Sequence, residues 1–221
     1  MKTLLTILNA KFIHSSLALR CLYTACRRRH VDVMTAEYTI NQNAYDILRH
    51  ISKFQAQVIG FSCYIWNIEM TCHIITLIKQ VYPQVIVFVG GPEVSYTARQ
   101  VLQDHPDIDY VLQGEGEEMV PAFLQALANG KSGIGIPGVM GRRDGRLAGD
   151  ETFQEVSNLD TLPFPYENED MNDLNHKIMY YESSRGCPFH CQYCLSGMND
   201  TVRFRSVPLV LQELQQFVDA G

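Results

Sequence analysis

The chain has 221 residues, of which 46% are hydrophobic and 19% charged, and its formal net charge is -6. It is long enough to bury a full core and to hold one domain plus part of a second. The negative charge supplies no general basic field for a phosphate backbone, so nucleic acid is unsupported as a partner. The apolar run near the N-terminus, TLLTIL, is too short for a signal peptide or a membrane span, which predicts a cytoplasmic protein without a membrane partner.

Five short apolar runs rich in β-branched residues are predicted to be strands. They alternate with segments of helical period, and strands that are apolar on both faces are typical of the interior of a parallel sheet. The pattern predicts an α/β fold, a doubly wound five-stranded parallel sheet of the Rossmann or flavodoxin type, with helices on both faces. The expected strands are residues 4–8, 31–38, 57–62, 85–90 and 109–114.

Helix boundaries follow from capping residues and from apolar spacing. Ser15 or Ser16 is expected to begin a helix that reaches Arg29, a second helix is expected over 42–54, and Asn67 is expected to cap a third. After the fifth strand, four apolar residues share one helix face, and a turn at 129–130 ends that helix. They are Val120, Phe123, Leu124 and Leu127.

The composition changes after the predicted sheet. Residues 129–150 are rich in glycine and include GRRDGR, a predicted hairpin, and a segment with two prolines and several acids follows. We therefore expect a first domain over 1–145 and a linker over 146–176. Residues 177–221 are predicted to supply a strand at 177–184, a loop and a helix that begins near Ser206, which together are too small to bury a core of their own.

The segment CPFHCQYC places Cys187, Cys191 and Cys194 within eight positions. A reducing cytoplasm and an odd total of seven cysteines disfavour disulfides, so clustered cysteines are better interpreted as metal or redox ligands. A structural zinc site would take four protein ligands, and no second cysteine pair follows. An iron–sulfur cluster held by three thiolates would leave one iron open for another ligand. The isolated cysteines are expected to be small core residues; they are Cys21, Cys26, Cys63 and Cys72.

The same segment resembles the C-x3-C-x-aromatic-C signature of the radical S-adenosylmethionine (SAM) superfamily, with Tyr193 at the aromatic position. The flanking ESSRGCPF and RFRS are also similar to that family. The resemblance implies that the three cysteines hold a 4Fe-4S cluster, that SAM chelates the open iron and that Tyr193 lies beside the adenine. It further implies reductive cleavage of SAM to a 5'-deoxyadenosyl radical, with a flavodoxin or ferredoxin as electron donor, and identifies 177–221 as the truncated first βα unit of a TIM-like barrel.

The loops after the first, third, fourth and fifth strands carry glycines and polar groups, as ligand-binding loops of open parallel sheets do. No dinucleotide or phosphate-loop fingerprint occurs in them. The GGP and GEGE loops and the D-x-L-P-x-P linker resemble the cobalamin-binding domain of cobalamin-dependent radical SAM enzymes. The resemblance implies that these loops bind cobalamin through Asn9, Ser62, Cys63, Tyr64, Gly90, Gly91, Pro92, Gly114, Glu115 and Gly116.

The D-x-H-x-x-G motif of domains that bind cobalt through a histidine is absent from the first loop, where His14 is the single imidazole. The resemblance therefore implies cobalamin without a histidine ligand. It predicts a radical SAM enzyme that transfers a methyl group to an unreactive carbon of an unknown substrate, or that performs a related rearrangement. Two alternatives remain open, namely a non-catalytic cobalamin-binding module and a flavodoxin-like domain with a structural zinc loop.

Overall fold

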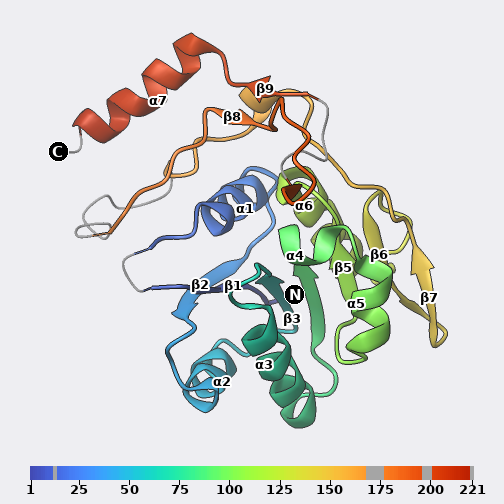
Figure 1. The fold of residues 1–221 in the computed structure, drawn as a ribbon. Coiled ribbons are helices and arrows are strands. Elements are labelled where there is room, and N and C mark those ends of the chain that lie inside the picture. The colour runs from blue at the N-terminus through green and yellow to red at the C-terminus, as the bar shows by residue number, and fades with distance from the viewer. Residues whose placement is uncertain (12–13, 168–176, 196–200, 220–221) are drawn as a thin grey trace.

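The computed structural model describes residues 1–11, 14–167, 177–195 and 201–219 and is organised around one twisted sheet (Figure 1). The strand order is β2-β1-β3-β4-β5-β6-β7. The first five of these strands are parallel, and the last two are antiparallel to their neighbours. The strands are β1 (Thr3–Asn9), β2 (Met34–Thr39), β3 (Val58–Ser62), β4 (Ile86–Gly90), β5 (Tyr110–Leu112), β6 (Val139–Arg143) and β7 (Arg146–Gly149).

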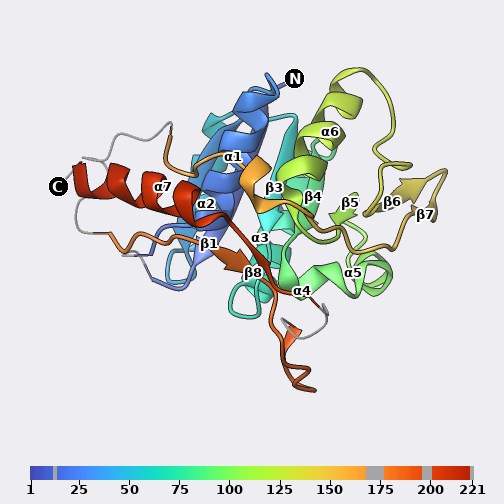
Figure 2. The same cartoon turned by 90° about the horizontal axis from the view of Figure 1, so that it is seen from above.

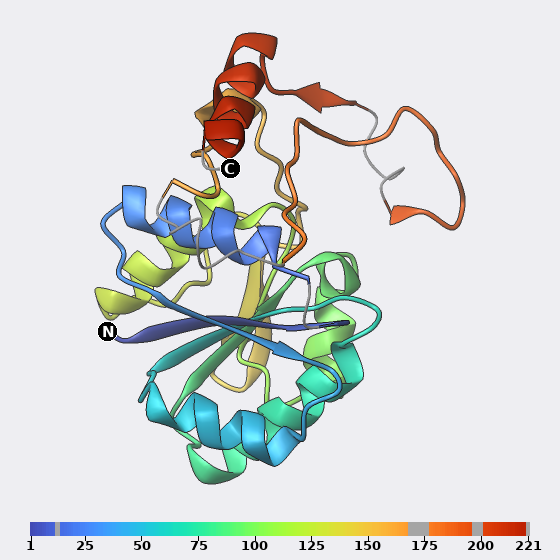
Figure 3. The same cartoon turned by 90° about the vertical axis from the view of Figure 1, so that its left-hand side faces the viewer.

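Helices cover both faces of the sheet (Figure 3). On one face, α2, α3 and α5 pack against alternate residues of the strands, and on the other face α1 and α6 do the same. The two faces meet in β1, whose seven residues are all buried. The helices are α1 (Leu17–Arg28), α2 (Ala44–Lys53), α3 (Ile68–Val81), α4 (Pro92–Ser95), α5 (Ala98–Asp104), α6 (Gly116–Ala128) and α7 (Val207–Asp219). None of the described helices has the length and apolar character needed to cross a membrane.

The predicted caps are confirmed for α1 but not for α3. The Ser16 hydroxyl accepts a hydrogen bond from the Leu19 backbone N–H at 3.2 Å, as an N-cap does. Asn67 precedes α3 without capping it through its side chain. Its amide nitrogen instead donates to the carbonyls of Leu8 and Ser62, at 3.0 and 3.1 Å. Asn67 therefore ties together the carboxyl ends of β1 and β3.

The predicted five parallel strands are confirmed, but the sheet has seven strands. The GRRDGR hairpin forms as β6 and β7, and β6 pairs with β5 through Leu112 and Val139. The predicted domain boundary at 145 therefore falls inside a hairpin that belongs to the sheet. The order of the first five strands is that of flavodoxin-like folds, in which ligands bind at the carboxyl ends of the strands.

The segment after 177 lies on the α1 and α6 side of the molecule (Figures 1 and 2). The predicted strand over 177–184 was wrong in extent, because most of this segment has no strand partner among the described residues. Ile178 forms a single bridge with His14, and β8 (Ser184–Arg185) pairs with β9 (Arg203–Phe204) over two residues.

The predicted helix after Ser206 is confirmed as α7, although its apolar face is mostly exposed. Phe217 is the apolar residue that packs, against Phe164 and Tyr166. Leu211 is 63% exposed. The start of the helix is held by the D-x-L-P-x-P segment, whose Leu162 and Pro163 carbonyls accept hydrogen bonds from Arg205 and whose Asp160 carboxylate accepts one from the Ser206 N–H.

Candidate functional site

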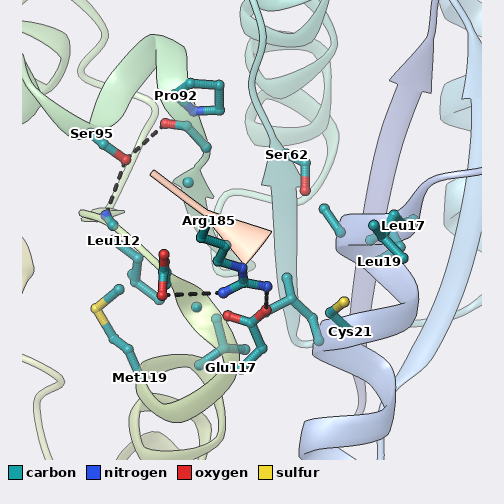
Figure 4. Close-up of a pocket in the computed structure, with 18 of the residues that line it drawn as sticks. Leu17, Leu19, Cys21, Ser62, Pro92, Ser95, Leu112, Glu117, Met119 and Arg185 are labelled. Carbon is teal, nitrogen blue, oxygen red and sulfur yellow. Dashed lines mark hydrogen bonds and ion pairs between the residues drawn. The ribbon is translucent and has the colours of Figure 1, made fainter. Parts of the chain in front are cut away.

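A cavity of about 550 Å³ lies over the carboxyl ends of β3, β4 and β5, between the sheet and helices α1 and α6 (Figure 4). Its wall on the sheet side includes apolar groups of Leu5, Phe88 and Leu112, and α6 adds Met119. An apolar wall combined with a small number of convergent polar and charged groups is typical of a cofactor site. Of the residues predicted to bind cobalamin, those in the cavity wall are Ser62, Tyr64, Gly90, Gly91, Pro92, Gly114, Glu115 and Gly116.

Two predicted cobalamin residues do not line this cavity. The Asn9 side chain is engaged elsewhere, donating to the His14 carbonyl at 3.2 Å and to the Glu37 carboxylate at 2.6 Å. Cys63 is fully buried in the core on the opposite face of the sheet, and burial raises the pKa of its thiol. Cys21, which was expected in the core, lines the cavity instead, and burial raises the pKa of its thiol as well.

The glycines of the strand-end loops are required mainly by packing within the protein. Gly91 has φ +103°, and a Cβ there would lie 2.6 Å from the Cys63 carbonyl oxygen. Gly114 has φ +106°, and a Cβ there would lie 2.1 Å from the Gln154 carbonyl oxygen. Contacts within the protein are therefore sufficient to require glycine at both positions. Gly90 is different, because its Cβ would lie no closer than 3.4 Å to its neighbours.

A buried hydroxyl fixes the distance between two of these loops. The Ser95 hydroxyl donates to the Gly91 carbonyl at 2.8 Å and accepts from the Gly114 N–H at 3.1 Å. Ser95 is 3% exposed and lines the cavity. The loops after β4 and β5 are therefore joined within the protein itself.

The acidic residues of the GEGEE loop are bound to arginines from the C-terminal segment. Arg185 of β8 lies in the middle of the cavity (Figure 4). It forms ion pairs with Glu115 at 3.2 Å, with Glu117 at 2.5 Å and with Glu182 at 2.7 Å. Arg203 of β9 donates to the two carboxylate oxygens of Glu115 from its two terminal guanidinium nitrogens, at 2.7 and 2.9 Å. These carboxylates are paired with protein cations, and Glu115, which was predicted to bind cobalamin, is one of them.

Burial and ion pairing act in opposite directions on the charges of this cluster. Burial disfavours the ionised form of Glu115, but the hydrogen bond from Arg203 and the charge of Arg185 outweigh it and hold the pKa of that carboxyl below its usual value. Burial also disfavours the charged Arg185, but the neighbouring carboxylates, Glu117 first, raise its pKa. Ion pairing therefore favours the charged forms of both Glu115 and Arg185.

Sequence reasoning did not assign a role to Arg185 or Arg203, although both lie in flanking stretches that carried the family resemblance, ESSRGCPF and RFRS. A signal was available in the combination of two arginines with the acid-rich GEGEE loop, because buried carboxylates require cationic partners. The signal was weak because the partners are 68 or more positions apart in the sequence.

His14, the single imidazole of the first loop, and Trp66, the neighbour of Tyr64, both lie outside the cavity wall. The His14 Nδ1 atom lies 2.5 Å from the Tyr180 hydroxyl, and His14 does not line the cavity. The absence of a histidine ligand to cobalt stays a prediction. Trp66 stacks on Tyr64 with ring centroids 4.4 Å apart, and it is Tyr64 that lines the cavity.

The three clustered cysteines lie on an irregular loop beyond the cavity. Cys191 is exposed and Cys187 and Cys194 are half-buried, with a turn in which the Cys194 N–H donates to the Cys191 carbonyl at 3.0 Å. Within the described part of the chain, no three histidine, cysteine or acidic side chains are gathered so as to hold a metal ion. Tyr193 is 93% exposed. The cluster ligands and the SAM contact therefore stay predictions from sequence, with sulfur donors of suitable chemistry that this geometry does not bring together.

Comparisons with known proteins agree with the fold. The uncharacterized methyltransferase PH0819 of Pyrococcus horikoshii is 28% identical over 208 residues, which is 90% of this chain and 44% of that protein. The cobalamin-dependent radical SAM methyltransferase TokK of Streptomyces tokunonensis is 30% identical over 63% of this chain and 22% of its own length. The solved structure of OxsB, a cobalamin-dependent SAM radical enzyme with aqua-cobalamin and SAM bound, superimposes with a TM-score of 0.81 at 19% identity, over 100% of this chain and 32% of its own.

The chain thus spans less than half the length of these relatives. The likeness to OxsB shows the shared fold. The model of the B12 binding domain matches residues 3–124, which is more than half of the chain and includes the loops after β1, β3, β4 and β5. The chain therefore belongs to the family of B12-binding domains.

Proposed function

We propose that the chain binds cobalamin in the cavity over β3, β4 and β5 and serves as the cofactor-binding part of a cobalamin-dependent radical SAM enzyme. The observation that carries the proposal is the position of this cavity, which is bordered by strand-end loops that the B12-binding domain match includes. The apolar wall suits a large planar ring, and the glycine and serine groups at the strand ends suit the amides at its edge. Gly90 places no side chain in that wall, although a Cβ there would clash with no neighbour.

Methyl transfer to an unreactive carbon is the proposed reaction of the complete enzyme, because methyltransferase is the activity in the names of PH0819 and TokK. When bound, the corrinoid supplies a transferable methyl group, and the 4Fe-4S cluster supplies the electron that cleaves SAM. The residues proposed for the cluster are Cys187, Cys191 and Cys194, and Tyr193 is proposed to contact SAM. A small electron-transfer protein such as flavodoxin or ferredoxin is the proposed donor.

The chain's own residues contribute positioning to this chemistry. Ser95 and Asn67 hold the strand-end loops at fixed separations, so the cavity does not have to be assembled by its ligand. Tyr64, stacked on Trp66, closes part of the wall with an aromatic surface. The apolar wall excludes water from the face of the ring that it covers.

The binding step is tested by titrating the chain with cyanocobalamin and measuring the corrinoid that remains with the protein after gel filtration. A Gly90→Val variant places a branched side chain in the cavity and is expected to weaken binding at least about tenfold, a loss of about 1.4 kcal/mol. Ala148→Val is the control, because Ala148 lies on β7 outside the cavity. Wild-type protein that retains no corrinoid, or a Gly90→Val variant that binds as well as the control, would contradict the proposal.

A second candidate is a cobalamin-binding module without radical chemistry. It is favoured by one observation, that the described residues do not gather the three loop cysteines around a metal position. Anaerobic reconstitution with iron and sulfide separates the two candidates. A paramagnetic cluster signal that changes when SAM is added supports the enzyme, whereas bound cobalamin without a cluster supports the module. Stoichiometric zinc without cobalamin would support a structural zinc loop instead.

A further inference from the structure

The loop that carries the three cysteines is attached to the cavity through the residue that precedes it. Arg185 lies two residues before Cys187, and its guanidinium sits inside the cavity with 14% of the side chain exposed. It is held there by carboxylates from the start of α6, Glu115 and Glu117. A ligand that fills the cavity therefore contacts or displaces the residue that precedes the loop.

The chain on both sides of the cysteines is fixed to the same carboxylate. Arg185 in β8 is the register partner of Arg203 in β9, and both guanidinium groups bind Glu115. Gly186, which joins Arg185 to Cys187, has φ +96°, and a Cβ there would lie 2.3 Å from the Thr201 carbonyl oxygen. The base of the loop has little freedom to move independently of Arg185, because its backbone is packed and paired at this point.

The loop itself is not arranged for metal binding in its described part. Its three thiols are not gathered, and they are half-buried or exposed. Binding a metal through them requires ordering of the loop, which costs conformational entropy. The base stays restrained while Arg185 stays in place, so a ligand in the cavity that packs against Arg185 keeps the base ordered and lowers the part of that cost that remains when the metal binds.

We propose that Arg185 is a positioning residue that couples the cavity to the cysteine loop, so that cobalamin in the cavity and a metal on the three thiols each strengthen the binding of the other. The proposal rests on the proposed function, since it takes cobalamin as the ligand of the cavity. Reciprocity follows from thermodynamic linkage, because each ligand must change the affinity of the other by the same factor. A typical coupling between two sites changes affinity by about fivefold or more.

The test measures cyanocobalamin affinity of the 221-residue chain with and without Cd²⁺, a thiophilic ion that serves as a probe for the three thiols. Wild type is expected to bind cyanocobalamin about fivefold or more tightly when Cd²⁺ is present. The triple variant Cys187→Ser/Cys191→Ser/Cys194→Ser is expected to lose the effect of Cd²⁺, which would show that the ion acts through the loop. The quantity compared between variants is the ratio of cyanocobalamin affinity with Cd²⁺ to that without it. If Arg185 had only a structural role, replacing it would change both affinities and leave this ratio unchanged.

The decisive variant is Arg185→Gln, in which the ratio is expected to fall to about one. The matched control is Arg28→Gln, because Arg28 forms an exposed ion pair with Glu167 away from the cavity, and this variant is expected to keep the full ratio. Arg185→Lys keeps the charge but not the forked geometry, and is expected to give a reduced ratio in a chain with native circular dichroism.

Each outcome decides a different statement. If wild type binds cyanocobalamin and Cd²⁺ changes its affinity by less than about twofold, which is below the usual range of coupling, the coupling is overturned and the proposed function stands. The same holds if Arg185→Gln keeps the wild-type ratio. If wild type does not bind cyanocobalamin at all, both the proposed function and the coupling fail.

Discussion

Replacing Gly114 with alanine tests whether this glycine serves the fold or the ligand. The new Cβ would lie 2.1 Å from the Gln154 carbonyl oxygen and 2.5 Å from its nitrogen. Gln154 has little room to retreat, because its N–H donates to the Gln113 carbonyl at 3.0 Å and its carbonyl accepts from the Glu115 N–H at 2.8 Å. The clash therefore has to be relieved by moving β5 and the segment after the hairpin apart.

Gly135→Ala supplies the matched control. Gly135 has φ +111°, close to the +106° of Gly114, but no heavy atom lies within 4 Å of the position that its new Cβ would occupy. Both substitutions carry the cost of a side chain at positive φ, about 1–3 kcal/mol. Overpacking adds about 1–3 kcal/mol to the Gly114 variant only. The difference between the two variants therefore isolates the steric term.

Urea unfolding followed by far-ultraviolet circular dichroism measures this difference. With a urea dependence of about 2 kcal/mol per molar, the midpoint of Gly114→Ala is expected about 0.5–1.5 M below that of Gly135→Ala. Equal midpoints would refute the steric reasoning. A Gly114→Ala chain that keeps the stability of the control but loses cyanocobalamin would show that the glycine makes room for the ligand instead.

Three further predictions concern buried charge. Glu115→Gln removes the carboxylate that Arg203 and Arg185 share, leaving Arg203 only the longer pair with Glu155 at 3.4 Å, and is expected to lower the free energy of unfolding by about 3 kcal/mol. Glu151→Gln, in an exposed pair, is expected to cost at most about 1 kcal/mol, and urea titration compares the two variants. Because the folded state lowers the pKa of Glu115, its contribution is complete above the unfolded pKa of about 4.3 and is lost as pH falls through the lower folded value. Acid should therefore destabilise wild type more than Glu115→Gln, and parallel acid melting curves would contradict this. Arg205→Met leaves the buried Glu213 carboxylate without its cationic partner and is expected to lower the free energy of unfolding by about 3 kcal/mol. The double variant Arg205→Met/Glu213→Leu is expected to recover most of that loss in thermal melting. Absence of recovery would argue that an unpaired buried charge is not the cause.

The sequence was sufficient for the parallel part of the fold because each strand and helix is specified locally. Apolar runs on both faces identified the five parallel strands, and Ser16 and the turn after Ala128 marked helix ends. The place of the hairpin in the sheet was not predictable in this way. It depends on pairing between Leu112 and Val139, which lie far apart in the sequence, and neither residue reveals its partner.

The candidate site was predicted at the level of loops rather than of individual contacts. A glycine at a strand end looks the same in the sequence whether it faces a ligand or another segment, and the neighbours that decide this, Cys63 for Gly91 and Gln154 for Gly114, are brought close by the fold. The acids of the GEGEE loop present the same difficulty. Their charge was visible in the sequence, but their partners Arg185 and Arg203 come from a segment expected to form a separate domain.

The hairpin of β6 and β7 forms one edge of the sheet and covers β5. Without it, β5 would end the sheet, and its unpaired amides would be open to solvent and to other chains. With it, the three strands that end beneath the cavity are all flanked on both sides. Fraying begins at exposed margins, so in amide hydrogen exchange the hairpin should release its protons well before the strands that support the cavity.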